Sequence, residues 1–144
     1  MPLFVLSPAS LAHSALFAGF YTFLSGNVAY HRCNLKKFSA ADNESDARLS
    51  AAVRAHANFA EYTPFAFGLL FLAELNGAPT AWVHGAYATL FAARVAHSVG
   101  MVNQCFNGIL RKVGFLTTLA VTLGAGVYNF SLGYEPLKSF LGIQ

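Results

Sequence analysis

Residues 113–134 read VGFLTTLAVTLGAGVYNFSLGY and contain no Asp, Glu, Lys or Arg. About 20 predominantly apolar residues in helical form are enough to cross the hydrocarbon core of a bilayer. Three other stretches of similar length and character lie at residues 8–30, 49–75 and 80–99. We therefore predict one domain over residues 1–144, an all-α integral membrane four-helix bundle with up-down topology.

The composition agrees with a protein whose main partner is the lipid bilayer. Of the 144 residues, 56% are hydrophobic and only 10% are charged, whereas soluble domains carry roughly a quarter charged residues. The basic residues form no stripe with interleaved aromatics, so we do not expect nucleic-acid binding. Cys33 and Cys105 form neither a CxxC motif nor a metal-spaced set, so we expect no metal site.

The connections between the four stretches predict an orientation in the membrane. Residues 76–79, Asn-Gly-Ala-Pro, stop one helix and start the next, which predicts an antiparallel hairpin. Basic residues gather around the first and third connections, whereas Lys138 lies alone on the other side. Positive charge favours the cytoplasmic side, so we predict that both termini are non-cytoplasmic. The basic residues concerned are Arg32, Lys36, Lys37, Arg48, Arg111 and Lys112.

Small residues recur at four-residue spacing in the first and fourth stretches. The rows are Ala18-Thr22-Gly26 and Thr118-Thr122-Gly126. Such rows allow membrane helices to approach closely, although a chain this rich in Ala and Gly also produces them by chance.

Ionisable residues within the apolar stretches are costly in hydrocarbon and usually turn inward toward a partner. Arg54, Asn58 and Glu61 stand at positions i, i+4 and i+7 of the second stretch, so they share one helix face. Arg94 and His97 share a face of the third stretch in the same way.

Two interpretations of this charge pattern remain open. In the first, Glu61 neutralises Arg54 or Arg94 in an internal ion pair that only holds the bundle together. In the second, three arginines, the third being Arg111 at the foot of the fourth stretch, outnumber the one carboxylate. The excess would then bind an anionic ligand whose carboxylates arginine can grip with both nitrogens. It would also favour the deprotonated form of a bound thiol.

Other polar residues in the stretches have simpler expected roles. We interpret His56 as a polar packing residue, and His13 and His84 as isolated structural or interfacial residues. Pro64 is expected to kink the second helix and widen a cleft. Glu74, at a helix end, is expected to be solvated.

The motif Arg-x-x-x-Asn-x-x-Glu-Tyr-x-Pro at residues 54–64, followed by Arg-x-x-His-x-x-Gly at residues 94–100, resembles the MAPEG family. This family comprises membrane-associated proteins of eicosanoid and glutathione metabolism. Residues 74–78, Glu-Leu-Asn-Gly-Ala, look more like the small uncharacterised bacterial members. The resemblance implies a homotrimer of four-helix subunits that bind glutathione as co-substrate, in clefts between neighbouring subunits near the cytoplasmic face.

The resemblance also implies roles for individual residues. Arg111 matches the arginine that stabilises the glutathione thiolate, and it is the expected catalytic residue. Relatives often carry tyrosines where this chain has Met101 and Phe115. The connection before Arg111 is about one residue longer here, so Lys112 competes with it for the role. The implied glutathione ligands are Arg32, Arg54, Asn58, Glu61, Tyr62, Arg94 and His97.

These observations favour a glutathione transferase or peroxidase that acts on a lipophilic small-molecule substrate arriving from the bilayer. One alternative is a non-catalytic MAPEG-like structural subunit of a larger membrane assembly. A third reading is a bundle that binds or transports small molecules.

Overall fold

The structure is a computed structural model that describes residues 6–103 and 108–143. It contains four long helices, α1 (Pro8–Leu35), α2 (Ala47–Leu75), α3 (Thr80–Val102) and α4 (Ile109–Leu141). A short 3₁₀ helix, η1 (Ala40–Glu44), lies in the connection between α1 and α2. The predicted all-α four-helix architecture is confirmed. Cys105, in the third connection, falls outside the described residues.

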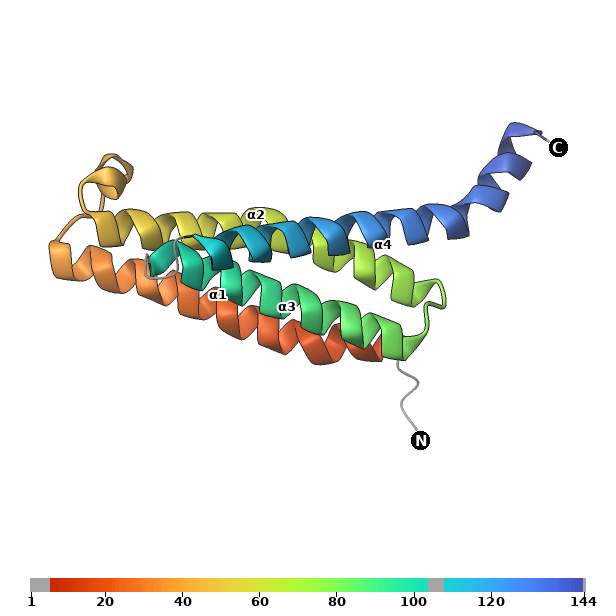
Figure 1. Cartoon of the computed structure of the whole chain (residues 1–144), viewed down its shortest axis with the longest axis horizontal. Coiled ribbons are helices and arrows are strands. Elements are labelled where there is room, and N and C mark those ends of the chain that lie inside the picture. The colour runs from red at the N-terminus through yellow and green to blue at the C-terminus, as the bar shows by residue number, and fades with distance from the viewer. Residues whose placement is uncertain (1–5, 104–107, 144) are drawn as a thin grey trace.

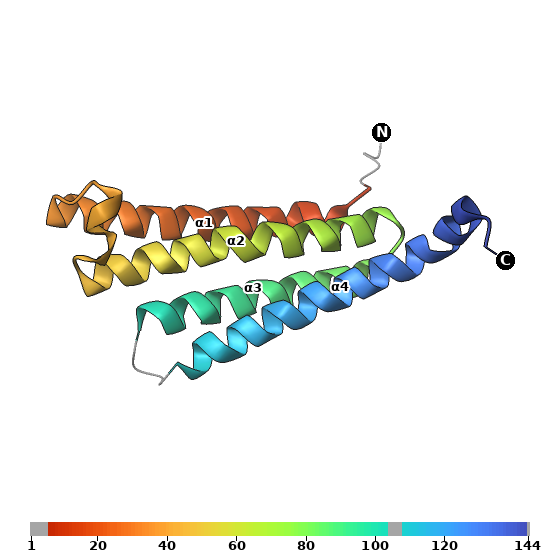
Figure 2. The ribbon, with the colours of Figure 1, turned by 90° about the horizontal axis from the view of Figure 1, so that it is seen from above.

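Successive helices run antiparallel along one long axis (Figures 1 and 2). Helices α2 and α3 each pack against the three others, whereas α1 and α4 lie on opposite flanks. The middle of the bundle is therefore the one place where residues of three helices can surround a single side chain.

The facing ends of α2 and α3, at residues 75 and 80, agree with the predicted hairpin, but all four helices extend beyond their predicted bounds, α1 and α4 the most. Helix α1 ends at Leu35, and the next residue, Lys36, caps it in a left-handed conformation. Helix α4 begins at Ile109 and continues through Pro136, and its last turns bend away from the bundle (Figure 1). Hydropathy reports the hydrocarbon-spanning part of a helix, so it misses the turns that continue beyond that part.

The start of α2 is set by a side-chain cap. The carboxylate of Asp46 accepts hydrogen bonds from the backbone N–H groups of Leu49 and Arg48 at 3.0 and 2.9 Å. These two donors would otherwise lack acceptors in the first helical turn. Hydrogen bonding from Leu49 N–H, the larger effect, and from Arg48 N–H lowers the pKa of Asp46 below its ordinary value of 3.8.

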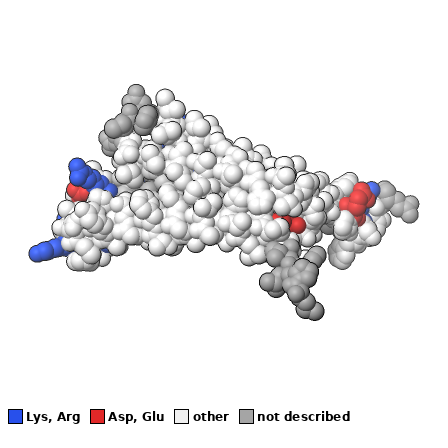
Figure 3. All heavy atoms as spheres, turned by 90° about the horizontal axis from the view of Figure 1, so that it is seen from below, with Lys and Arg blue, Asp and Glu red and all other residues white. Residues whose placement is uncertain are grey.

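The outer surface of the bundle is apolar. Large hydrophobic side chains point outward along its length, among them Leu123 at 70% exposure and Phe65 at 64%. On the face shown in Figure 3, charged side chains gather toward the two ends. Among the described helices, α4 is the one whose length and apolar composition by themselves suffice for a span, and only 17% of its most apolar window is buried. A surface of this kind is suited to lipid rather than to water.

Two glycines bring α3 and α4 into backbone contact. A Cβ atom on Gly114 would lie 2.7 Å from the backbone nitrogen of His97, and one on Gly100 would lie 2.5 Å from that of Arg111. By contrast, Gly26 and Gly126 of the small-residue rows face open space. Within the described part of the subunit, the close approach of helices is therefore made at Gly100 and Gly114 and not at these two glycines.

Glu74 is buried rather than solvated, which corrects the expectation for this residue. It is 6% exposed. Its carboxylate accepts hydrogen bonds from the backbone N–H groups of Ala9 and Ser10, at 2.7 and 2.9 Å, and from the Ser10 hydroxyl. Thus a carboxylate of α2 caps the N-terminus of α1, where unsatisfied N–H groups and the helix dipole favour negative charge.

The two histidines near this end are not isolated. The rings of His13 and His84 lie 5.2 Å apart between centroids, and His13 stacks on Tyr87 at the same distance. The Tyr87 hydroxyl in turn lies 2.8 Å from the Ser10 hydroxyl. This end of the bundle is therefore joined by a polar network across three helices.

Candidate functional site

Arg94 is the centre of the candidate site. Its side chain is fully buried on α3, and its Nη2 donates a 2.6 Å hydrogen bond to the side-chain oxygen of Asn58 on α2. Its Nη1 donates a longer hydrogen bond, 3.5 Å, to the Thr118 hydroxyl on α4. The guanidinium carbon lies 5.8 Å from the centre of the Tyr62 ring, within the range of a cation–π interaction. One cation thus joins three helices.

The partners of Arg94 are neutral. Within the described residues, the ion pairs are Arg54–Glu44 and Lys138–Glu135, and neither includes Arg94. The Nε atom of Arg94 has no hydrogen-bond partner there either. Buried charges are normally paired, so the positive charge of Arg94 is only partly compensated by the dipoles around it.

His97 lies one turn after Arg94 and is 3% exposed. Its Nδ1 atom lies 2.8 Å from the backbone carbonyl oxygen of Arg111. A carbonyl oxygen only accepts, so Nδ1 carries the proton and Nε2 is left as an acceptor. That Nε2 atom is buried without a partner among the described residues. The contact fixes the start of α4 against α3 and positions Arg111 beside the site.

A cavity of about 510 Å³ opens next to these residues. This volume lies within the range of small-molecule sites. Tyr62 and Phe115 pack edge to face in its wall, with ring centres 5.6 Å apart and ring planes at 83°. Arg111 and Lys112 both line the cavity, so the fold does not favour either of them for the expected role. The lining residues are Asn58, Tyr62, His97, Gly108, Arg111, Lys112 and Phe115.

The fold brings five of the predicted site residues together: Asn58, Tyr62, Arg94, His97 and Arg111. Three others lie elsewhere in the subunit. Arg54 is exposed and pairs with Glu44 at 3.9 Å, and Glu61 is exposed. Arg32 donates hydrogen bonds to the Asn43 side chain and the Ser39 carbonyl, at 2.6 and 3.3 Å.

The internal ion pair that the sequence left open is not formed within the described part of the subunit. Glu61 contacts neither Arg54 nor Arg94 as a salt bridge. Arg54, Asn58 and Glu61 occupy a broad face of α2. Asn58 lies on the part that packs against Arg94, whereas Arg54 and Glu61 are exposed.

Thr118 was missed by the sequence analysis as a site residue. It is fully buried, and its hydroxyl donates to the Gly114 carbonyl at 2.8 Å while accepting from Arg94. Its position in a row of small residues was visible, but a threonine in an apolar helix carries no signal that distinguishes this role. His56 forms a 3.0 Å contact with the Ser25 hydroxyl, which is in keeping with its interpretation as a packing residue.

Comparison with known proteins places these residues in a family context. Residues 10–131 match the model of the MAPEG family. The chain is also similar to the inner membrane protein YecN of Escherichia coli, from strain K12 and from O6:H1 strain CFT073, at 38% identity over 96 residues in each case. The matched region covers 67% of this chain and 70% of the relative. The whole site, from Asn58 to Thr118, lies inside the family match.

Proposed function

The chain belongs to the MAPEG family, a family of membrane four-helix bundles, and we propose that it binds glutathione and acts as a transferase or peroxidase on lipophilic electrophiles. One observation carries the proposal. The buried Arg94 has no acidic partner among the described residues, and it lies beside a cavity lined by two further cations, Arg111 and Lys112.

The residues fit the groups that glutathione carries. Its two carboxylates match guanidinium groups, which bind carboxylates with paired hydrogen bonds. His97 lines the cavity and carries a buried acceptor, Nε2, without a partner among the described residues. Arg94 lies behind Asn58 and Tyr62, which line the cavity, and contributes its positive charge from there. Arg111 at the cavity wall adds positive charge where a thiolate would be favoured.

In the proposed reaction, bound glutathione supplies a thiolate nucleophile. The task of Arg94 is to hold the cavity positive and to keep Asn58 and Tyr62 in place around it. His97 anchors the start of α4 so that Arg111 stays at the cavity. Arg111 stabilises the negative charge on sulfur, which raises the fraction of the reactive form at neutral pH. The apolar outer surface gives lipophilic electrophiles access from the bilayer.

We also propose that the working unit is a homotrimer. Arg32, Arg54 and Glu61 lie outside the cavity of their own subunit, so in this proposal they serve a site shared with a neighbouring copy. Glu61 then pairs with the ammonium of glutathione. Glu61→Gln keeps the shape but deletes the charge and should weaken glutathione binding by about 1.5–3 kcal/mol, the usual value of a charged hydrogen bond. Native mass spectrometry that returned only monomers or dimers would contradict the trimer.

One observation favours a second candidate, a MAPEG-like subunit that binds but does not catalyse. Phe115 lines the cavity and presents no hydroxyl that could take part in chemistry. The two candidates share the binding site and differ in turnover.

The test is calorimetry with glutathione on the detergent-purified protein, followed by turnover with a model electrophile. Binding together with conjugation supports the transferase, and binding without turnover supports the non-catalytic candidate. The absence of binding heat from the folded native protein would exclude both candidates and favour a structural subunit of a larger membrane assembly that does not bind glutathione.

A further inference from the structure

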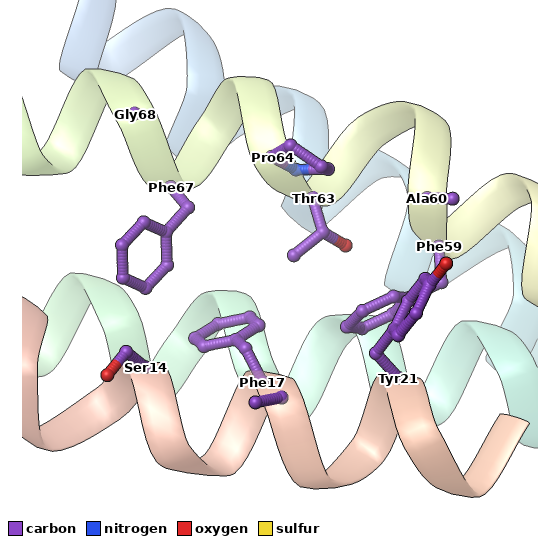
Figure 4. A pocket seen from close by; sticks show the side chains of 10 residues that line it. Ser14, Phe17, Tyr21, Phe59, Ala60, Thr63, Pro64, Phe67 and Gly68 are labelled. Carbon is purple, nitrogen blue, oxygen red and sulfur yellow. The ribbon is translucent and has the colours of Figure 1, made fainter. Parts of the chain in front are cut away.

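A second cavity lies on the other side of α2, between that helix and α1 (Figure 4). Its volume is about 600 Å³. At about 100° per residue, Asn58 and Tyr62 point to one side of α2, whereas Ala60, Thr63 and Phe67 point to the opposite side. This groove is therefore separate from the site around Arg94, and it has walls from a single subunit.

The groove walls are mainly apolar, and three side-chain hydroxyls line them, those of Ser14, Tyr21 and Thr63. The Ser14 hydroxyl donates to the carbonyl of Leu11 within its own helix, whereas that of Thr63 is buried and unpartnered. Thr63 is 3% exposed, and its hydroxyl has no hydrogen-bond partner among the described residues. A threonine in a helix ordinarily returns its hydroxyl to the carbonyl four residues earlier, yet here the hydroxyl points into the space between α1 and α2 (Figure 4). A buried hydroxyl without a partner costs free energy, so a ligand that binds it gains that energy back.

The next residue provides the complement. Pro64 lies inside α2 and has no N–H, so the carbonyl of Ala60 loses the donor that helical geometry would give it. Ala60, Thr63 and Pro64 all line the groove. A hydrogen-bond donor and a free acceptor thus lie within one turn of each other at the same wall. A hydroxyl group can satisfy both, because it donates and accepts; an ether can only accept, and a hydrocarbon does neither.

The remaining walls indicate the shape of the ligand. Phe17 meets Phe67 edge to face, with ring centres 5.4 Å apart and planes at 81°, and Phe59 lies 6.3 Å from Phe17. Tyr21 lies beyond Phe59 at 6.4 Å. Aromatic rings favour further aromatic rings in such tilted arrangements. The volume suits one small molecule.

We propose that this groove binds a lipophilic phenol that enters from the bilayer. Its ring lies among Phe17, Phe59 and Phe67, while its hydroxyl donates to the Ala60 carbonyl and accepts from the Thr63 hydroxyl. The proposal goes beyond glutathione binding, because no residue of the Arg94 site takes part.

The test compares three matched probes on the full-length protein in lipid nanodiscs: 4-octylphenol, its methyl ether 4-octylanisole, and 4-octyltoluene. Binding is measured by equilibrium dialysis. Each hydrogen bond should be worth about three- to tenfold in affinity, so the phenol should bind most tightly and the toluene least. Thr63→Val should weaken the phenol and the ether by that factor and leave the toluene unchanged, and Thr63→Ser should restore both.

A second pair of variants tests the location. A Cβ atom on Gly68 or on Gly19 would meet nothing within 4 Å, but only Gly68 lines the groove. Gly68→Leu should therefore reduce binding of all three probes at least tenfold, whereas Gly19→Leu should not. Equal affinities for the three probes, or no response to Thr63→Val, would overturn the proposal. So would a Gly68→Leu variant that changes the subunit count and leaves probe binding intact, because the groove would then be occupied by a second copy.

Discussion

Arg94 lies fully buried where α2, α3 and α4 meet, and its neighbours offer dipoles rather than charge. An amide oxygen and a hydroxyl orient the guanidinium without neutralising it. The site is therefore both fixed in position and electrostatically incomplete. Arg111 and Lys112, which line the cavity, can contribute different amounts of charge stabilisation to a bound ligand, and single substitutions can tell the two contributions apart.

We expect Arg111→Ala to leave most glutathione binding intact and to lower kcat, because a contact made chiefly to the developing charge acts on the chemical step. The ultraviolet absorbance of the thiolate reports the apparent pKa of bound glutathione. That pKa should rise in Arg111→Ala and change much less in Lys112→Ala. A larger shift in Lys112→Ala would mean that the two residues exchange roles. No thiolate in the unmodified protein would contradict catalysis by this site.

Helical periodicity predicted one shared face correctly and the other only in part. Arg94 and His97, at i and i+3 of α3, are both buried. Of Arg54, Asn58 and Glu61, at i, i+4 and i+7 of α2, Asn58 turns toward Arg94, whereas the other two are exposed. Glu74 could not be placed in the same way. Its partners are backbone N–H groups of residues 64 and 65 positions earlier, and every helix N-terminus offers such groups. From sequence alone, an acidic residue near a helix end is expected to be solvated. Only the fold shows that the N-terminus of another helix packs against it.

At the scale of helices, the contact of α3 with α4 sets the geometry of the site. Gly114→Ala should destabilise the protein by about 1–3 kcal/mol, the usual cost of overpacking, because its Cβ would meet the backbone of His97. Gly126→Ala is the matched control on the same helix. It faces open space and should be neutral or stabilising by up to about 1 kcal/mol. Thermal unfolding in detergent compares the two, and equal effects would contradict the close approach.

The cap of α2 predicts a dependence of stability on pH. Folding lowers the pKa of Asp46, chiefly through the N–H of Leu49, so its contribution is present above the ordinary aspartate value of 3.8. It is lost as the pH falls through the lower pKa of the folded state. Asp46→Asn keeps a capping side chain without a titrating group. The stability difference between the two proteins should therefore change on acidification below that ordinary value. A constant difference would show that Asp46 makes no such contribution.

At the scale of the whole molecule, the charge distribution predicts the orientation. Basic residues surround the α1–α2 connection and the start of α4, whereas the far end holds Lys138 in an ion pair with Glu135. We expect the Ser139→Cys variant, made in a background without Cys33 and Cys105, to react with a membrane-impermeant maleimide on right-side-out vesicles. The matched Ser45→Cys variant should react only after permeabilisation. The reverse pattern would invert the topology.

Hydropathy identified the four-helix bundle because each stretch is apolar on most sides, and this pattern does not depend on how the helices pack. The same uniformity explains what it missed. Where a helix is apolar on most sides, as α4 is, the sequence does not show which glycine faces a neighbour and which faces lipid. Gly114 and Gly126 look alike in sequence and differ only in the fold.

The carboxylate of Glu74 has a consequence for how the protein is made. The first helix is synthesised long before Glu74, the residue that accepts hydrogen bonds from its leading N–H groups. The acceptor arrives only when the second helix is nearly complete. The hydrogen bonding of the first helix is therefore completed only when the α1–α2 hairpin forms, which makes that hairpin, and not the single helix, the first piece that can reach its final local structure.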